Sequence, residues 1–342
     1  MTLVKRSLAL ALALMLLFVF ISCDIPLGNA QLERKSRISY DYFDTVATLY
    51  SFSGDSNSAF DENFRAFEAE LSLCHKLFDI YHEYDGMNNV ATVNKNAGKD
   101  PVKVDGRLID LLIFAKEMHA LTDGAVNVAM GSVLKIWHEY REQGKRIPEQ
   151  AELLSASLHC DIDSVIINEA ESTVYLSDPE MSLDLGSVAK GYAIDRCAAV
   201  LRARGAYSYA IDVGGNIYAI GSKSDGSAFK TGIENPTGGD YSAWIEVADG
   251  SVATSGDYQR YYIYGGVRYH HIINHETLFP AYFHRSVSIY SDSAALSDAL
   301  STALFNMDTN SAKALVKEKF PSVREVIFVG ESGEGVSFRP LT

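Results

Sequence analysis

The sequence predicts an α+β protein that folds as one domain behind an N-terminal leader. Two observations favour this class. Short runs rich in Tyr, Ile and Val are concentrated in the second half of the 342-residue chain. Segments with apolar residues every three or four positions precede and follow these runs. Because the two kinds of segment do not alternate regularly, a parallel sheet wound from βαβ units is not expected. The composition, 47% hydrophobic and 22% charged, is that of a globular protein.

Residues 1–22 are predicted to be a lipoprotein signal peptide. Two basic residues precede an apolar run over 8–21, which is shorter than the roughly 20 residues needed to span a bilayer. The run ends at Ser22, a small residue directly before Cys23, so Cys23 is the predicted lipidation site. An ordinary secretory signal with an incidental cysteine is the alternative. We expect a protein of the bacterial periplasm, anchored through lipid to the inner membrane, because Asp24 favours inner-membrane retention in some bacteria.

The segment 23–40 is predicted to be a tether that lifts the folded part off the membrane, because it contains Pro, Gly and Asn and shows no periodicity. Residues 41–342 contain no repeat and no linker, which predicts a single domain. Its three cysteines, at positions 74, 160 and 197, have no C-x-x-C spacing. We therefore expect buried single thiols and neither a disulfide framework nor a zinc site.

The first half of the domain is predicted to contain two helices and a hairpin. Over 57–80, Phe and Leu residues recur at three- and four-residue steps, which indicates an amphipathic helix. Leucines on one face predict a second helix over 107–121, with Gly124 just beyond its end. Two short β-branched runs at 164–167 and 173–176 predict a hairpin.

The second half of the domain is predicted to be rich in strands. A helix is expected over 188–203, after Gly186, and two more over 294–306 and 310–319. The predicted strands lie at 207–213, 217–220, 243–247, 258–264, 267–273, 287–290 and 325–329.

The acidic balance of the chain excludes nucleic acid as a partner. The 30 Lys+Arg residues against 44 Asp+Glu give a formal net charge of −14. A protein that binds a phosphate backbone needs a basic face instead. Any nucleotide that this chain binds must therefore be held by a local cluster of groups.

One candidate site is the junction at 182–191, where an apolar segment meets Gly186 and a helix begins. Free backbone amides at the helix N-terminus, with Lys190 in the first turn, would meet an anion there. The glycine spacing matches neither a P-loop nor a dinucleotide-binding fingerprint. On the pattern alone, a simple turn remains the alternative.

A second candidate lies on the helix predicted over 294–306. Asp298 and Thr302 are four residues apart, so they share a helix face and both oxygens can reach one cation. Oxygen ligands suit Mg²⁺, which usually keeps several waters and also binds substrate phosphates. The alternative is a solvated Asp beside a Thr that bonds to its own helix.

A third candidate covers 252–274. The sequence Thr254-Ser-Gly reads as a turn, and the alternating aromatics after it predict a strand pair with one ring-rich face. Such a face would stack a flat heterocycle, although Tyr-rich sheet surfaces are commonly structural. The neighbours His270 and His271 point to opposite faces of a strand, so only one of them can line a site.

Taken together, five motifs in order resemble the ApbE family of FAD:protein FMN transferases. The matches run from about residue 43 to 307 and are DLGxxAKGYAxD at 184–195, the GGD/N turn at 212–216, ATSGDY at 253–258, HIxD/N at 271–274 and DALxT at 298–302. The resemblance implies a single ApbE-type domain over 41–342, with mixed or antiparallel sheets and flanking helices around a central flavin-binding cleft.

The resemblance also implies the site. FAD is the expected substrate, and the implied nucleotide contacts are Phe43, Tyr84, Asn88, Ala125, Val126, Asn127, Asp184, Lys190 and Ile273. Mg²⁺ is the expected cofactor, bound by a main-chain oxygen of Ser187 and by the side chains of Asp298 and Thr302. The implied catalytic residues are Lys190, Asp298 and His271.

The implied reaction is a phosphoryl transfer in which a hydroxyl attacks the FMN-side phosphorus of FAD and AMP leaves. Mg²⁺ and Lys190 would neutralise the developing charge, and His271 would position or deprotonate the hydroxyl. A Thr of an acceptor protein gives covalent flavin, whereas water gives FMN and AMP. The implied partners are acceptor flavoprotein subunits of membrane redox complexes. Two alternatives stay open: an FAD pyrophosphatase without an acceptor, and a periplasmic reservoir that binds FAD without turnover.

Three departures from the family pattern fall where the family holds the nucleotide. Asn88 replaces a Ser in a SEISRIN-like stretch, GAFD appears as Gly124-Ala-Val-Asn127, and MGT appears as Phe43-Asp44-Thr45. These changes bear on the affinity for FAD and on the balance of transfer against hydrolysis. They leave the metal and pyrophosphate motifs intact.

Overall fold

The computed structural model describes residues 34–341. The predicted signal peptide over 1–22, the lipidation site Cys23 and the tether as far as residue 33 lie outside the described residues. Within the described part of the chain, no helix is both long and apolar enough to cross a bilayer.

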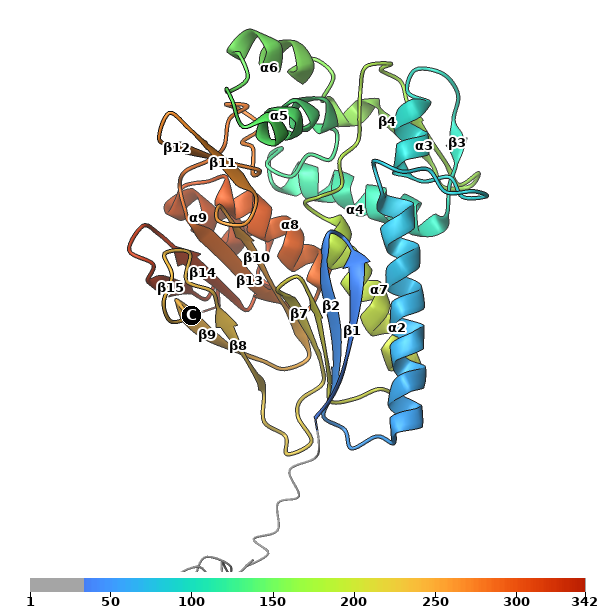
Figure 1. Ribbon diagram of the computed structural model, residues 1–342, viewed down its shortest axis with the longest axis vertical. Helices are drawn as coiled ribbons and strands as arrows, with labels where there is room; N and C mark the ends of the chain where they lie inside the picture. Colours follow the sequence, from blue (N-terminus) through green and yellow to red (C-terminus); the bar gives the residue numbers. More distant parts are fainter. Residues whose placement is uncertain (1–33, 342) are drawn as a thin grey trace, which may run out of the picture. The chain divides into compact units, whose positions relative to one another are not determined.

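An eight-stranded sheet, in which every neighbouring pair is antiparallel, organises the chain (Figure 1). In spatial order its strands are β1 (Lys35–Tyr42), β2 (Thr45–Ser51), β6 (Tyr209–Val213), β7 (Asn216–Ile220), β10 (Gly250–Gly256), β13 (Ser286–Ser291), β14 (Glu325–Val329) and β15 (Gly335–Phe338). Strands from both ends of the chain thus lie in one sheet, which confirms the predicted α+β class.

Strand β1 begins inside the segment predicted to be a tether, because residues 35–39 pair with β2 at the sheet edge. The side chains of Ile38 and Tyr40 on this strand are both exposed. An edge strand with exposed apolar residues has no burial pattern to reveal it, so its pairing is visible only in three dimensions.

Helices cover one face of the sheet. Helix α2 (Asn57–Phe78) packs on α7 (Ala189–Ala203), and α7 packs on α8 (Ala294–Phe305), which lies on β10 and β13. Helix α9 (Thr309–Lys319) follows α8. Alternate residues of the strands, such as Leu49 and Ile289, are buried in this helical core. The other face is covered in part by the hairpin of β8 (Phe229–Ile233) and β9 (Ala243–Val247).

A second group of elements lies between α2 and α7 in the sequence. It contains the helices α3 (Val90–Lys95), α4 (Gly106–Leu121), α5 (Gly131–Gln143) and α6 (Gln150–Ser157), the 3-10 turn η1 (Ile162–Ser164) and the small sheet of β3 (Val102–Lys103), β5 (Thr173–Leu176) and β4 (Val165–Asn168). Trp137 of α5 packs against the hairpin of β11 (Tyr261–Tyr264) and β12 (Val267–His270), so this group contacts the strand-rich half of the domain.

The predicted elements whose apolar residues recur at regular spacing are confirmed. The helices predicted over 57–80, 107–121 and 188–203 are α2, α4 and α7, and the predicted hairpin is β4–β5. The prediction of a turn at Thr254 was wrong, because residues 254–256 continue β10 and pair with β13 across the sheet. Ser255 and Gly256 have little β propensity, so the end of this strand has only a weak signal in the sequence.

The three cysteines of the described residues are free, as predicted. Cys74 and Cys197 are buried and Cys160 is partly buried. Burial raises the pKa of the Cys74 thiol to about 12 and that of Cys160 to about 11, and it also raises the pKa of Cys197. These thiols are therefore protonated and poor nucleophiles near neutral pH.

Candidate active site

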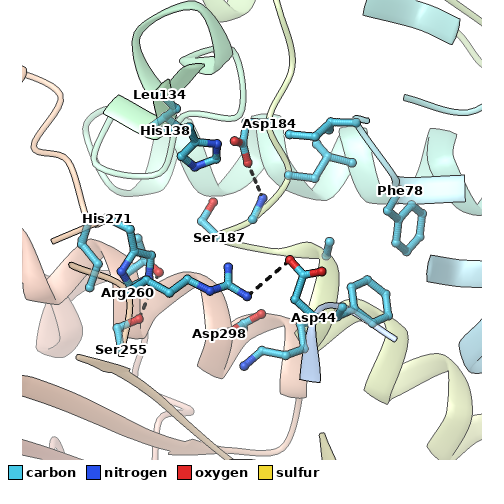
Figure 2. Close-up of a pocket in the computed structure, with 18 of the residues that line it drawn as sticks. Asp44, Phe78, Leu134, His138, Asp184, Ser187, Ser255, Arg260, His271 and Asp298 are labelled. Atoms are coloured by element: carbon cyan, nitrogen blue, oxygen red, sulfur yellow. Dashed lines mark hydrogen bonds and ion pairs between the residues drawn. The ribbon is translucent and has the colours of Figure 1, made fainter. Parts of the chain in front are cut away.

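A cavity of about 760 Å³ opens between the group of elements that lies between α2 and α7 in the sequence and the strand-rich half of the domain (Figure 2). Eleven residues that were predicted to form the site line it: Phe43, Tyr84, Ala125, Asn127, Asp184, Ser187, Lys190, His271, Ile273, Asp298 and Thr302. Since they come from both halves of the domain, the fold brings together motifs that are far apart in the sequence.

Two predicted contact residues lie outside this cavity. The amide of Asn88 donates to the main-chain oxygen of Lys103 (2.8 Å), and Asn88 borders a separate small depression. The side chain of Val126 is fully buried in the core, its N–H donates to Thr122 Oγ1 (3.1 Å), and its carbonyl contacts His119 Nδ1 (3.1 Å). Both main-chain polar groups of Val126 therefore already have partners within the protein.

Asp298 is held rigidly at the wall of the cavity, and it is not the solvated residue of the alternative interpretation, because it is only 7% exposed. The backbone N–H of Gly191 donates to its Oδ2 and Asn216 Nδ2 donates to its Oδ1, both at 2.8 Å. Burial raises the pKa of this carboxyl, against the lowering effect of Lys190 and the two hydrogen bonds. One turn further along α8, Thr302 Oγ1 lies 3.1 Å from Ser255 Oγ of β10.

Helices α7 and α8 approach each other closely at Gly191, which has no side chain to keep them apart. A Cβ atom at this position would lie 2.3 Å from the carbonyl oxygen of Ala294 and 2.6 Å from Cβ of Asp298. The absence of a side chain therefore lets the Gly191 amide reach the carboxylate.

We expect Gly191→Ala to lower the free energy of unfolding by about 2 kcal/mol, because the added methyl group must push α8 away from α7. Thermal unfolding of the variant measures this. Gly106→Ala at the start of α4 is the matched control, since its Cβ would meet no atom within 4 Å. Equal melting temperatures for the Gly191 variant and the parent chain would contradict the close contact.

Lys190 lies in the first turn of α7, as predicted, but the backbone amides around it are mostly not free. Those of Val188 and Ala189 donate to the carbonyl of Leu185 at 3.0 and 2.8 Å, and that of Gly191 donates to Asp298. The charge available to an anion is therefore mainly that of the Lys190 side chain. Burial lowers its pKa, while Asp298 and Asp212 nearby act in the opposite direction.

Two further cations line the cavity, and the sequence patterns missed both. Arg260 directly precedes β11 and Arg141 lies on α5. Burial and the neighbouring Arg260 lower the pKa of Arg141. Arg260 lies within the predicted ring-rich stretch, whereas Arg141 carries no motif and is found only through the fold. With Lys190, these residues place three cationic side chains in the wall of the cavity, beside four aspartate side chains.

His271 faces the cavity from the end of β12, whereas His270 points away and contacts the carbonyl of Ala281 (2.7 Å), as their alternation predicted. The His271 backbone N–H donates to the carbonyl of Arg260 (3.1 Å). Its Nδ1 is buried and has no hydrogen-bond partner among the described residues. Burial, followed by the charge of Arg260, lowers the pKa of His271 from 6.5 to about 3, so the imidazole is neutral near pH 7.

This lowered pKa predicts an acid sensitivity. The unfolded chain takes up a proton on His271 below about pH 6.5, whereas the folded chain resists it down to about pH 3, so stability is lost as the pH falls between these values. We expect His271→Gln to lose less of its melting temperature than the parent chain between pH 7 and pH 4. Parallel losses in the two proteins would show that the imidazole is readily protonated in the folded state.

The predicted ring-rich face of the strand pair does not line the cavity. Tyr262 and Tyr269 pack with each other and with Trp137, and Ile263 is exposed. Only the ends of this hairpin, at Arg260 and His271, reach the site. The aromatic side chains in the cavity wall come instead from other segments: Phe43, Phe78, Tyr81 and Tyr84.

The comparison with known families agrees with this geometry. The model of the ApbE family matches residues 38–328. The chain belongs to the ApbE family. It is 36% identical over 256 residues to the FAD:protein FMN transferase of Treponema pallidum (strain Nichols), over 70% of each chain. It is 28% identical over 266 residues to that of Klebsiella pneumoniae (strain 342), over 75% of this chain and 82% of the relative.

Solved ApbE structures share the fold. The ApbE protein of Thermotoga maritima superposes with a TM-score of 0.79 at 28% identity, over 90% of this chain and 97% of that one. The flavinyl transferase ApbE of Pseudomonas stutzeri, in its apo form, has a TM-score of 0.75 at 25% identity, over 90% and 94%. The predicted single ApbE-type α+β domain is therefore confirmed.

The donor atoms of this ApbE chain fit the Mg²⁺ that the family resemblance implies. Asp298, Thr302 and Ser187 all line the cavity and offer only oxygen. The described residues contain no group of three or more His, Cys, Asp or Glu side chains placed to hold a metal. A site with one carboxylate, hydroxyl groups and main-chain oxygens leaves room for water and phosphate, which is how Mg²⁺ is usually bound.

Proposed function

We propose that this chain is an Mg²⁺-dependent FAD:protein FMN transferase, which attaches FMN through a phosphoester to a Thr of an acceptor flavoprotein and releases AMP. The observation that carries the proposal is that Lys190 on α7 and Asp298 on α8 line one cavity and that their charges interact there. Its volume of about 760 Å³ lies within the roughly 300–1,000 Å³ typical of ligand pockets. The names of the relatives support the choice of substrate.

In the proposed reaction, the acceptor oxygen forms a bond to the FMN-side phosphorus and the bond from that phosphorus to the AMP oxygen breaks. The ammonium of Lys190 neutralises charge on the phosphoryl oxygens. Neutral His271 accepts a hydrogen bond from the attacking hydroxyl and holds it in position, and the proton of that hydroxyl is released to solvent as the bond to phosphorus forms. When bound through Asp298, Thr302 and a main-chain oxygen of Ser187, Mg²⁺ supplies further charge neutralisation on the phosphates.

The two alternatives use the same cavity. An FAD pyrophosphatase would place water where the acceptor hydroxyl lies. A reservoir that only binds FAD has no need of a carboxylate whose two oxygens are oriented by fixed donors, as those of Asp298 are. This orientation favours turnover over storage.

The location and the partners are part of the same proposal. Cys23, preceded by Ser22, supports export and lipid anchoring in the bacterial periplasm. An enzyme held at a membrane would meet acceptor flavoprotein subunits of membrane redox complexes as its protein partners.

One experiment separates the three activities. The purified chain is incubated with FAD and Mg²⁺, with and without an acceptor flavoprotein subunit, and AMP and protein-bound flavin fluorescence are measured. AMP together with a fluorescent acceptor band is the expected result. AMP in both reactions without a fluorescent acceptor would favour the pyrophosphatase, and unchanged FAD in both would exclude an enzyme.

A further inference from the structure

The side chain of Arg260 extends from the wall that carries His271 toward the turn between β1 and β2 (Figure 2). One of its guanidinium nitrogens, Nη2, lies 3.7 Å from Oδ2 of Asp44. Arg260 also lowers the pKa values of Lys190, His271 and Arg141, so its charge acts throughout the cavity. A phosphate group entering this cavity would therefore meet Arg260 as well as Lys190.

The carboxylate of Asp44 differs from the others that line the cavity. Asp298 and Asp184 accept hydrogen bonds from the backbone, and Asp79 accepts from Tyr84 and from the backbone. Within residues 34–341, the Asp44 carboxylate makes only the ion pair with Arg260, and its side chain is 82% exposed. This ion pair, which has no hydrogen bond, is therefore the contact in the cavity wall that a ligand can most easily break.

The backbone of the turn fixes the direction of Asp44. Phe43 and Asp44 both have φ +54°, in the left-handed region that non-glycine residues rarely adopt. The turn is held by the pairing of Tyr42 with Thr45 and by the Phe43 N–H, which donates to His75 Nδ1 (3.3 Å). Such a conformation persists only where the surroundings impose it, so the carboxylate is kept near the cavity whether or not Arg260 is bound to it.

We propose that Asp44 competes with the phosphates of the substrate for Arg260 and thereby sets the affinity for phosphate-bearing flavins. This inference rests on the proposed function, because it takes FAD as the ligand. Binding of the pyrophosphate requires Arg260 to exchange the Asp44 carboxylate for phosphate oxygens. Asp44 therefore weakens binding of FAD but has no such effect on riboflavin, which carries no phosphate.

The test is a set of binding titrations of the full chain without Mg²⁺, with FAD, ADP and riboflavin as ligands. Asp44→Asn removes the charge but keeps a residue that tolerates the left-handed region. We expect this variant to bind FAD and ADP about three- to fivefold more tightly, with unchanged affinity for riboflavin. Asp100→Asn, on the surface outside the cavity, is the control for net charge and should leave all three affinities unchanged.

The double variant decides between competition and general repulsion. Arg260→Gln should weaken binding of FAD and ADP, and the gain from Asp44→Asn should fall below about twofold in that background. A gain that persists in full without Arg260, or an Asp44 variant that binds FAD no more tightly than the parent chain, would overturn the proposal. If the parent chain binds FAD neither without nor with Mg²⁺, the proposed function fails instead.

Discussion

Asp298→Asn is expected to lower Mg²⁺-dependent cleavage of FAD by about 10³-fold at saturating FAD. The substitution removes the negative charge from the only carboxylate in the proposed metal site while changing few other atoms. Loss of the several kcal/mol that a bound metal contributes to a phosphoryl-transfer transition state corresponds to a change of about this size. The measurement is the initial rate of AMP release over a range of Mg²⁺ concentrations.

Asparagine is a better replacement than alanine because Asp298 is buried and both of its oxygens accept hydrogen bonds. Alanine would leave the Gly191 N–H and the Asn216 amide without acceptors, which destabilises a buried site. The side-chain amide introduced by Asp298→Asn keeps one oxygen, which can still accept from the Gly191 N–H. If the Asn216 amide rotates, its oxygen can accept from the NH₂ group of the new side chain. We therefore expect the melting temperature to change little.

The matched control is Asp292→Asn, which removes the same charge just before α8 from a side chain that is 66% exposed. It should retain the parent rate. If Asp298→Asn remained active at saturating FAD and Mg²⁺, the proposed metal site would be wrong. If activity and melting temperature fell together, the carboxylate would be required for the fold, and its role in turnover would not be supported.

The sequence could predict those parts of the fold whose signal is local. The period of Phe and Leu over 57–80 placed α2 within two residues of its observed end at Phe78. The four-residue spacing placed Asp298 and Thr302 on one helix face. A turn was predicted at Thr254 where β10 continues. The strand conformation there is imposed by pairing with β13, which is distant in the sequence.

The parts of the site that depend on contacts between distant residues could not be predicted from sequence patterns. Asp298 is oriented by the amide of Gly191, which is 107 residues away, and only the packing of α7 on α8 makes that hydrogen bond. Arg141 lies on an unpredicted helix and reaches the cavity because α5 packs on the β11–β12 hairpin. Helix-terminal amides were predicted to bind an anion, but the fold uses most of them for its own hydrogen bonds.

Lys190→Ala is expected to lower the turnover of FAD by about 10²-fold while changing its binding by less than about threefold. The reason is that charge grows on the phosphoryl oxygens in the transition state, so a partly buried cation at that point interacts more strongly with the transition state than with bound FAD. Arg141 and Arg260 remain in the cavity and still attract the pyrophosphate of the ground state.

The separation of turnover from binding is what distinguishes this role of Lys190 from simple attraction. Turnover at saturating FAD and the dissociation constant for FAD are measured for the parent chain and for Lys190→Ala, with Lys223→Ala on a loop outside the cavity as the control. Lys190→Arg, which keeps a charge, should recover part of the lost turnover. A loss confined to binding, with turnover unchanged, would mean that Lys190 contacts the phosphates equally in the ground state and the transition state. Burial lowers the pKa of Lys190 and the charge of Asp298 raises it, so removal of either charge shifts the pKa of the other group. The double variant Lys190→Ala/Asp298→Asn should consequently lose much less than the product of the two single effects.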